Sequence, residues 1–282
     1  MSGREKIIGV LGGMGPLATA DFYAKLVRLT PARADQDHLR VIIDSNPKIP
    51  DRTAGLSGEG PDPTPALVDT ARGLERAGAD LIAIPCNSAH AYLPAIRRAV
   101  AIPVLDIMHE VAAAVASLAP RPRSVGLLAT PGTIRAGLYH RALAGYGIEI
   151  VDCSEEEEVD VLQTIKAVKG GDLGQGVRLR ARAVAAALIA RGAAAVVLGC
   201  TEIPLVLGPE QVPAPVFDGT EILAAAVVRD ALPAGAPLPP EYPVSPRRCC
   251  SKSLTGVIST PADPMRGAGT HCADGSASAR RP

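Results

Sequence analysis

Two cysteines, Cys86 and Cys200, occur in matching surroundings in the two halves of the sequence. Each lies eight positions after a Gly-Ala corner, counted from Gly78 (86 − 78) and from Gly192 (200 − 192), and an apolar run of strand length fills the interval. A thiolate can act as a general base and a thiol as the matching acid. Two thiols on opposite sides of one substrate would remove a proton from one face of a carbon atom and return one to the other face, which is the geometry of inversion.

Each cysteine is expected where a strand ends and a helix begins. The positive end of a helix lowers the pKa of a thiol from about 8.5, so this position predicts that thiolate is available near neutral pH. A cysteine on an apolar strand is usually only a small buried hydrophobe. It is the matched positions of Cys86 and Cys200 that favour a catalytic pair.

The repeat extends beyond the cysteines in both directions. Residues 8–15 match residues 125–132 before the cysteine, and residues 102–106 match residues 214–218 after it. Three matches in one order indicate two halves of one design.

Strand and helix patterns alternate along the whole repeat, which predicts parallel sheets with ligands at the carboxyl ends of the strands. A polar, proline-rich loop after the second strand, residues 45–65, has the length of a binding loop. The expected strands are residues 6–11, 41–44, the run before Cys86, 103–105, 124–128, 147–151 and the run before Cys200; the expected helices are 17–29, 65–77, 92–100, 109–118, 174–191 and 220–231, with another starting at 155–158.

Composition narrows the class of partner. The chain has 282 residues, with 29 Lys and Arg against 29 Asp and Glu, so charge gives no reason to expect nucleic acid or an acidic membrane. A small molecule is the expected partner. No apolar stretch approaches the length of a membrane span and the first residues lack the pattern of a signal peptide, so we expect a cytoplasmic protein.

The six cysteines form no C-x-x-C pair, so neither a metal site nor a disulfide is expected in the folded part. Residues 233–282 are rich in Pro, Gly, Ser and Arg and are predicted to be a disordered tail. This tail contains Cys249, Cys250 and Cys272, and a metal clip of these cysteines with His271 is the less favoured alternative to no role at all.

Five segments together resemble the cofactor-independent aspartate/glutamate racemases. The resemblance covers about residues 5 to 232, and Ser88 stands where threonine is commoner in that family. The segments are GVLGGMGPLATA (9–20), NPKIPDRT (46–53), PCNSAH (85–90), LLATPGT (127–133) and GCTE (199–202).

The resemblance implies a fold of two similar Rossmann-like α/β domains, related by a pseudo-twofold axis, with the active site in the cleft between them. Residues 1–106 with 218–232 would form the first domain and residues 107–217 the second. It also implies a homodimer that racemises aspartate or glutamate without a cofactor. Cys86 and Cys200 would be the acid/base pair and Arg52 and Lys169 would hold substrate carboxylate; the remaining residues expected to contact substrate are Asn87, Ser88, Thr130, Thr133 and Thr201.

These residues also have structural interpretations. Arg52 could be a solvent-exposed loop charge, Lys169 could close a helix, and the threonines could only cap helices. His90 and His109, near helix starts, are interpreted as structural, and Tyr23, Tyr92 and Tyr139 as packing residues.

Other functions remain open at this point. Gly13-x-Gly15-x-x-Ala18 partly fits a dinucleotide-binding fingerprint, with Asp44 as the ribose-binding acid of an NAD-dependent oxidoreductase. That match starts one residue late and explains neither cysteine. A cis–trans isomerase, a racemase of broad specificity and an amino-acid-binding protein are compatible with the same fold, whereas a decarboxylase would need only one proton donor.

Overall fold

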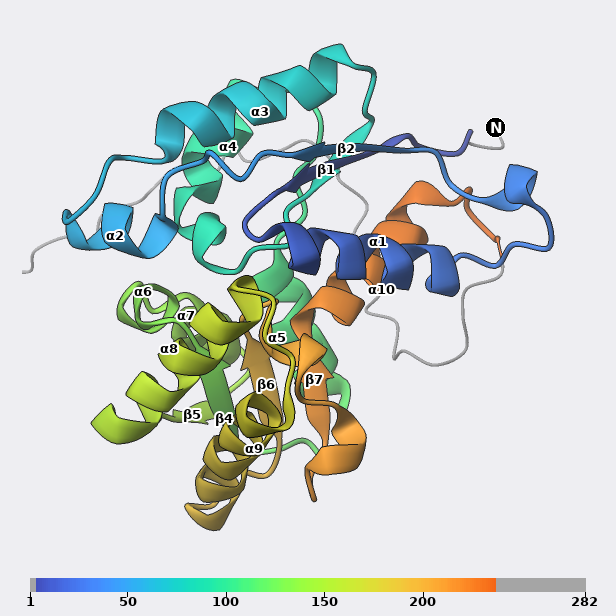
Figure 1. Cartoon of the computed structure of the whole chain (residues 1–282). Coiled ribbons are helices and arrows are strands. Elements are labelled where there is room, and N and C mark those ends of the chain that lie inside the picture. Colours follow the sequence, from blue (N-terminus) through green and yellow to red (C-terminus); the bar gives the residue numbers. More distant parts are fainter. Residues whose placement is uncertain (1–3, 237–282) are drawn as a thin grey trace, which may run out of the picture. The chain divides into compact units, whose positions relative to one another are not determined.

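Two parallel sheets, one in each half of the chain, form the framework of the protein (Figure 1). The computed structural model describes residues 4–236, which belong to one compact unit. The predicted disordered tail and its cysteines lie outside the described residues, except for residues 233–236. The strands are β1 (Ile8–Gly12), β2 (Val41–Ser45) and β3 (Leu81–Ala83) in the first sheet, and β4 (Ser124–Ala129), β5 (Glu149–Val151), β6 (Val196–Gly199) and β7 (Val216–Asp218) in the second.

The two sheets repeat one topology, as the sequence predicts. The strand orders are β2-β1-β3 and β5-β4-β6-β7, so the first strand of each half is flanked by the second and third strands of that half. Every pairing is parallel, with Ile8 opposite both Val41 and Leu81 in the first sheet. The predicted α/β fold with two similar halves is confirmed.

The last strand of the first half is the main departure from the predicted elements. The segment 103–105 was expected to pair as a strand, but it forms only a single parallel bridge, between Val104 and Ile82. The N–H of Ile82 donates to the Pro103 carbonyl at 2.9 Å, and the N–H of Leu105 donates to the Ile82 carbonyl at 3.0 Å. The equivalent segment of the second half, β7, is a full strand.

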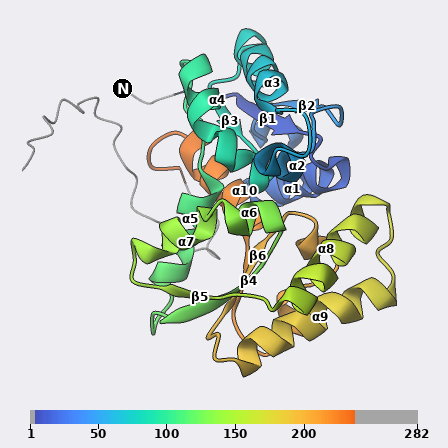
Figure 2. The same cartoon turned by 90° about the vertical axis from the view of Figure 1, so that its left-hand side faces the viewer.

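Helices connect the strands on both faces of the sheets (Figures 1 and 2). The predicted loop 45–65 contains a short helix, α2, which the sequence analysis missed; its N-cap is Asp51, whose carboxylate accepts the Ala54 N–H. The helices are α1 (Pro16–Leu29), α2 (Arg52–Ser57), α3 (Thr64–Arg76), α4 (Leu93–Ala99), α5 (Ile107–Ser117), α6 (Pro131–Arg135), α7 (Leu138–Ala144), α8 (Glu155–Lys169), α9 (Gln175–Ala190) and α10 (Gly219–Ala231), with 3₁₀ helices η1 (Asp35–Asp37), η2 (Ser88–Tyr92), η3 (Ile203–Leu205) and η4 (Pro209–Gln211).

Helix α10 joins the two halves after the second sheet is complete. It packs against α1 of the first half and against α5, and the N–H of Lys6 donates to the carbonyl of Ala231 at 3.0 Å. The ammonium group of Lys25, on α1, lies 2.6 Å from carboxylates of both Asp21 and Asp218. The predicted division into residues 1–106 with 218–232 and residues 107–217 stays a prediction.

The largest apolar core spans both halves. It includes Phe22 and Leu26 of α1, Val111 of α5, and Leu223 and Val227 of α10, all almost completely buried. Burying one such side chain contributes about 1.5–3 kcal/mol. Within residues 4–236 no helix is long and apolar enough to cross a membrane.

Candidate active site

The segments that carry the two cysteines meet directly. The hydroxyl of Thr201, the residue after Cys200, donates to the carbonyl of Pro85, the residue before Cys86, at 3.3 Å. The two segments belong to opposite halves and are 116 positions apart in the sequence. The structure therefore brings the matched cysteine motifs together.

Cys86 lies in a turn after β3 and is only 4% exposed. Its Sγ is 3.7 Å from Oγ of Ser88, another predicted site residue. Nδ1 of His90 bonds to the Cys86 carbonyl at 2.9 Å, while Nε2 of His90 accepts the N–H of Ile107 at 3.2 Å. Because Nε2 is an acceptor, Nδ1 carries the proton and donates it to the carbonyl. Burial lowers the pKa of His90, which agrees with the neutral, structural role expected for it.

Cys200 directly follows β6, is 6% exposed, and has a carboxylate as its partner. Its Sγ donates to Oε2 of Glu202 at 3.0 Å. Oε1 of the same carboxylate accepts the N–H of Gly15 at 3.0 Å, from the loop before α1 in the other half. Glu202 is itself 2% exposed. It therefore links the second cysteine to the first half of the chain.

The expectation that a helix start lowers the thiol pKa is wrong for Cys200. Burial, reinforced by the charge of Glu202, raises the pKa of the Cys200 thiol well above its ordinary value, and the Lys169 ammonium opposes this only in part. The structural reason is local. Cys200 is followed by a short 3₁₀ helix, η3, and a buried carboxylate lies against it, whereas the 3₁₀ helix after Cys86, η2, leads into the expected helix α4.

Arg52 is buried, not a solvent-exposed loop charge, with an exposed fraction of 7% at the first turn of α2. Its Nη1 donates to the carbonyls of Ile49 and Pro50, at 3.1 and 2.8 Å. Its Nε is buried and has no partner among the described residues. A buried guanidinium with a donor to spare can accept a carboxylate as its partner.

Asn87, the neighbour of Cys86, is held from the other half. Its Oδ1 accepts the hydroxyl of Tyr139, on α7, at 2.6 Å. Tyr139 is completely buried, and burial raises the pKa of its hydroxyl, which keeps that group a donor. The interpretation of Tyr139 as a packing residue was incomplete for this reason. The Nδ2 of Asn87 is buried without a partner in the described part of the chain.

Thr130 and Thr133 form a second cluster at the carboxyl end of β4. Their hydroxyl oxygens are 3.0 Å apart, and Thr130 is the N-cap of α6, as its structural interpretation anticipated. α6 packs against α2: a Cβ built on Gly132 would lie 2.7 Å from Oγ1 of Thr53, so only glycine allows this approach. The cluster thus adjoins Arg52, although no hydrogen bond among residues 4–236 joins either threonine to a cysteine.

Lys169 ends α8 and is exposed, which agrees with the structural interpretation of a helix-closing lysine. Its Cγ lies 4.0 Å from the place that a Cβ on Gly15 would occupy, and its charge is near enough to Cys200 to lower the pKa of that thiol. It therefore lies beside the Cys200–Glu202–Gly15 group.

Two buried residues of this site were missed from the sequence, Glu202 and Tyr139. Glu202 stands in the segment GCTE, two positions after Cys200, so the sequence did indicate that it lies near this cysteine. Tyr139 and Asn87 are 52 positions apart, and no sequence pattern indicated their contact.

The dinucleotide-binding alternative meets a specific obstacle. In such a fingerprint the N–H groups at the start of the helix hold a pyrophosphate. Here the N–H of Gly15 is bonded to the Glu202 carboxylate, whose charge would repel a phosphate at that place.

Comparisons with known proteins agree with one family. The family model described as Asp/Glu/hydantoin racemase matches residues 11–227. The chain is 30% identical over 229 residues to the broad specificity amino-acid racemase RacX of Bacillus subtilis (strain 168), covering 79% of this chain and 96% of that protein.

Solved structures show the same fold. The aspartate racemase of Picrophilus torridus superposes with a TM-score of 0.73 at 31% identity, over 80% of this chain and 94% of that one. An aspartate racemase homologue from Pyrococcus horikoshii OT3 gives 0.63 at 30% identity, over 80% and 99%. The glutamate racemase of Francisella tularensis in complex with D-glutamate, at 20% identity and a TM-score of 0.58 over 80% of each chain, shares the fold.

Proposed function

Because the chain belongs to the Asp/Glu/hydantoin racemase family, and is thus an isomerase that racemises amino acids, we propose that Cys86 and Cys200 interconvert L- and D-aspartate without a cofactor. The observation that carries this proposal is the hydrogen bond from Thr201 to Pro85. It joins the residues next to the two thiols, which come from opposite halves. Opposed acid and base groups are what inversion at one carbon requires.

The two thiols start in different states. Cys86 acts as the thiolate that removes the alpha proton of one enantiomer, and Cys200 acts as the thiol that protonates the other face. The raised pKa of Cys200 and its hydrogen bond to Glu202 support its assignment as the acid. After one turnover Cys86 is a thiol and Cys200 a thiolate, which is the state that converts the other enantiomer.

The intermediate needs positive charge and hydrogen-bond donors. Loss of the alpha proton leaves an enolate-like carboxylate, whose charge must be stabilised within the site. Two buried donors without partners in residues 4–236, Nε of Arg52 and Nδ2 of Asn87, are suited to bind it. Their lack of partners supports the proposal because buried polar groups are normally paired.

The other predicted residues complete the substrate site. Lys169 would neutralise a substrate carboxylate near Cys200, while Thr130 and Thr133 would donate hydroxyl hydrogens beside Arg52. Ser88 supports the Cys86 thiol, and Thr201 holds the two cysteine segments together. A dicarboxylic substrate fits a site with two separate cations, Arg52 and Lys169.

A racemase of wider specificity is the second candidate. It is favoured by the 30% identity to RacX of B. subtilis over 96% of that protein. Glutamate is the next acidic substrate to consider, since the residues assigned here bind the groups that aspartate and glutamate share.

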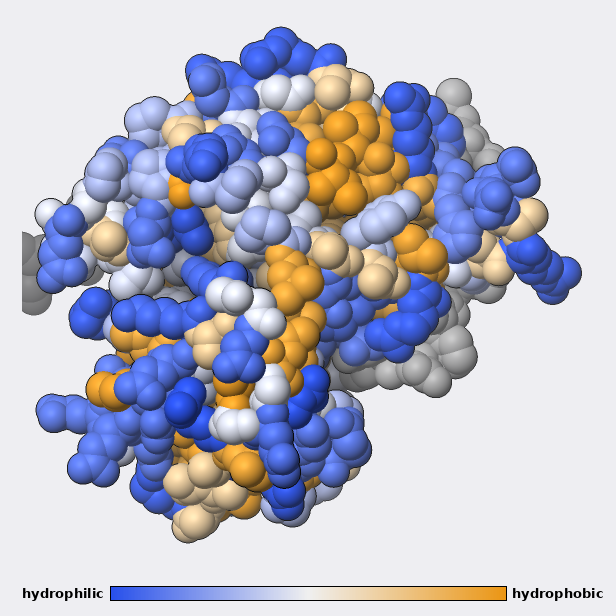
Figure 3. Space-filling view, in the orientation of Figure 1, coloured by the Kyte–Doolittle hydropathy of each residue, from blue (hydrophilic) through white to orange (hydrophobic). Residues whose placement is uncertain are grey.

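We further propose that the protein is a cytoplasmic homodimer. Support for the dimer comes from large apolar side chains left exposed on α1 and on the edge strand β2, including Tyr23 and Ile43, at 42% and 38%. Figure 3 shows apolar side chains gathered over the region of β2. An unpaired edge with an apolar surface is a surface that proteins commonly cover.

Proton NMR in heavy water tests the activity. Purified protein is incubated with L-aspartate, L-glutamate and L-alanine, and loss of each alpha-proton signal is followed together with optical rotation, without added cofactor. Exchange with decay of rotation for aspartate supports the proposal, and exchange of alanine at a similar rate favours wide specificity. Folded, reduced protein that exchanges no amino acid would refute both.

A further inference from the structure

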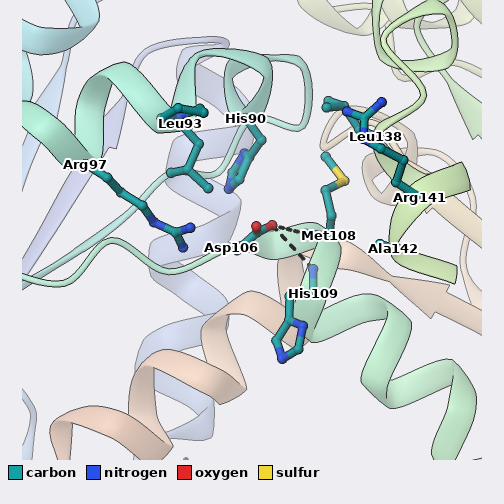
Figure 4. Close-up of a pocket in the computed structure, with 10 residues that line it drawn as sticks. His90, Leu93, Arg97, Asp106, Met108, His109, Leu138, Arg141 and Ala142 are labelled. Carbon is teal, nitrogen blue, oxygen red and sulfur yellow. Dashed lines mark hydrogen bonds between the residues drawn. The ribbon is translucent and has the colours of Figure 1, made fainter. Parts of the chain in front are cut away.

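A cavity of about 540 Å³ lies beside His90, among residues to which the proposed reaction assigns no role. Its walls come from both halves of the chain: α4 lies on one side, α7 on the other, and the first turn of α5 between them (Figure 4). Cavities of this size hold small organic ligands.

Two arginines line the cavity on opposite sides, Arg97 from α4 and Arg141 from α7, and both are exposed to solvent (Figure 4). Each is anchored by a backbone carbonyl: Nη2 of Arg97 donates to Val104 at 2.8 Å, and Nη1 of Arg141 donates to Ala136 at 2.7 Å. Neither has a carboxylate partner within salt-bridge distance in the described part of the chain, and each keeps further N–H donors. The cavity therefore offers two positioned, unneutralised cations.

One carboxylate lies between these cations. Oδ1 of Asp106 accepts the N–H groups of Met108 and His109, at 3.0 and 3.3 Å, and so caps α5. Its other oxygen, Oδ2, has no hydrogen-bond partner among residues 4–236. With neutral histidines, two arginines and one aspartate leave the lining with a net charge of +1 (2 − 1).

We propose that this cavity binds a small zwitterion with two carboxylates and one ammonium group. The carboxylates pair with Arg97 and Arg141, and the ammonium group pairs with Asp106. Leu93, Met108 and Leu138 supply apolar contacts for the rest of the ligand. A free acidic amino acid and a dipeptide that begins with an acidic residue share this charge pattern.

His90 connects the cavity to the proposed catalytic base. The imidazole lines the cavity, yet its Nδ1 donates to the carbonyl of Cys86 and its Nε2 accepts the N–H of Ile107. Ile107 directly follows Asp106, the residue that receives the ammonium group. A ligand that shifts Asp106 therefore acts through Ile107 and His90 on the position of Cys86, so we infer that the bound zwitterion changes the racemase rate.

Calorimetric titration of the full chain tests the binding site. The probes are L-aspartate and L-aspartyl-L-alanine, which distinguish the two ligand sources, with succinate and L-alanine as controls that each lack one of the required groups. The affected variants are Arg97→Met, Arg141→Met and Asp106→Asn, which retain most of the side-chain volume. The matched control is Arg98→Met, an exposed arginine of α4 that does not line the cavity.

We expect L-aspartyl-L-alanine to bind, with Kd raised about tenfold or more in each of the three cavity variants and unchanged in Arg98→Met. Because L-aspartate also binds the proposed substrate site, only the part of its binding that is lost in the three variants is assigned to the cavity. Succinate and alanine should bind more weakly. Equal Kd values in all four variants, or no binding of either zwitterion to folded protein, would overturn the proposed site. Thermal unfolding of each variant verifies that the comparison is between folded proteins.

Racemisation of aspartate with and without the dipeptide tests the coupling. This measurement rests on the proposed function, whereas the calorimetry does not, so the two can fail separately. We expect a change of a fewfold in kcat/KM that is lost in Arg141→Met and kept in Arg98→Met. An unchanged rate at saturating dipeptide would overturn the coupling.

Discussion

The thiol of Cys200 donates to Glu202 across 3.0 Å, and the same carboxylate accepts the N–H of Gly15 from the other half of the chain. This relationship gives the second thiol a fixed direction, and burial together with the charge of Glu202 raises the pKa of that thiol. It also makes the proton affinity of Cys200 depend on how the two halves fit together, because Glu202 contacts both.

Glu202→Gln removes the charge beside Cys200 while keeping an oxygen that can accept the Gly15 N–H. Since that charge raises the pKa of Cys200, its removal should lower the pKa, and alkylation of Cys200 should begin at a lower pH by about one pH unit or more. The rate of alkylation is followed by mass spectrometry of the Cys200 peptide, which separates it from the other cysteines.

The matched control is Glu210→Gln, an exposed glutamate eight positions further along (210 − 202). Its alkylation profile should equal that of the unmodified protein. A Glu202→Gln profile that is unchanged, or that moves to higher pH, would contradict the assignment of Glu202 as the partner that holds the thiol protonated.

Cys86→Ser and Cys200→Ser should each reduce racemisation by about a hundredfold or more, because a serine hydroxyl is a far weaker acid than a thiol and is not ionised near neutral pH. Polarimetry with each enantiomer of aspartate measures the loss. Cys153→Ser is the control: this third described cysteine is half-buried and donates only to the carbonyl of Leu127. The two-thiol mechanism is wrong if either site variant racemises as fast as Cys153→Ser.

Arg52→Lys should raise the KM for aspartate by about tenfold, because lysine keeps the charge but loses the planar pair of donors that binds a carboxylate. Steady-state kinetics measures this, and thermal unfolding separates it from the lost bonds to Ile49 and Pro50. Lys48→Ala, a change to an exposed charge of the same loop, provides the comparison. Equal KM values in the two variants would remove Arg52 from the substrate site.

His90 should make the folded protein less stable at acid pH. Burial lowers its pKa below the ordinary value of 6.5, so below that pH the unfolded chain binds a proton that the folded chain does not. The free energy of unfolding is therefore fully retained above about pH 6.5 and falls below it, by up to about 1.4 kcal/mol per pH unit.

Urea unfolding between about pH 7 and pH 5 measures this effect. His90→Gln should flatten the pH dependence even if its stability is lower throughout, whereas His109→Gln, a change at an exposed histidine, should keep the slope. A slope that survives in His90→Gln would assign the acid sensitivity to another group.

The repeat was the most informative part of the sequence. Equal intervals from Gly78 to Cys86 and from Gly192 to Cys200 predicted two parallel sheets of one topology, and the structure confirms them. The spacing of apolar residues within a strand or helix depends on that segment alone, so it can be recognised in the sequence without knowledge of the tertiary contacts. At residues 103–105 the predicted strand was reduced to a single bridge.

The chemistry between the halves could be predicted only in part. Cys86 and Cys200 were predicted as a pair because their motifs match. The burial and the Glu202 carboxylate that raise the pKa of Cys200 were overlooked, and the helix that was expected to lower this pKa is a 3₁₀ helix. The bond from Tyr139 to Asn87 depends on how α7 lies against the first half. The spacing of residues along the sequence does not determine how closely α7 approaches the first half.

The bond from the N–H of Lys6 to the carbonyl of Ala231 makes the chain suitable for circular permutation. It brings the start of β1 and the end of α10 side by side, so a short Gly-Ser linker would join residues 5 and 232. New termini could then be opened in the 119–123 segment between α5 and β4. Such a circular permutant should keep the fold, because the apolar core shared by the two halves holds them together whichever segment links them covalently.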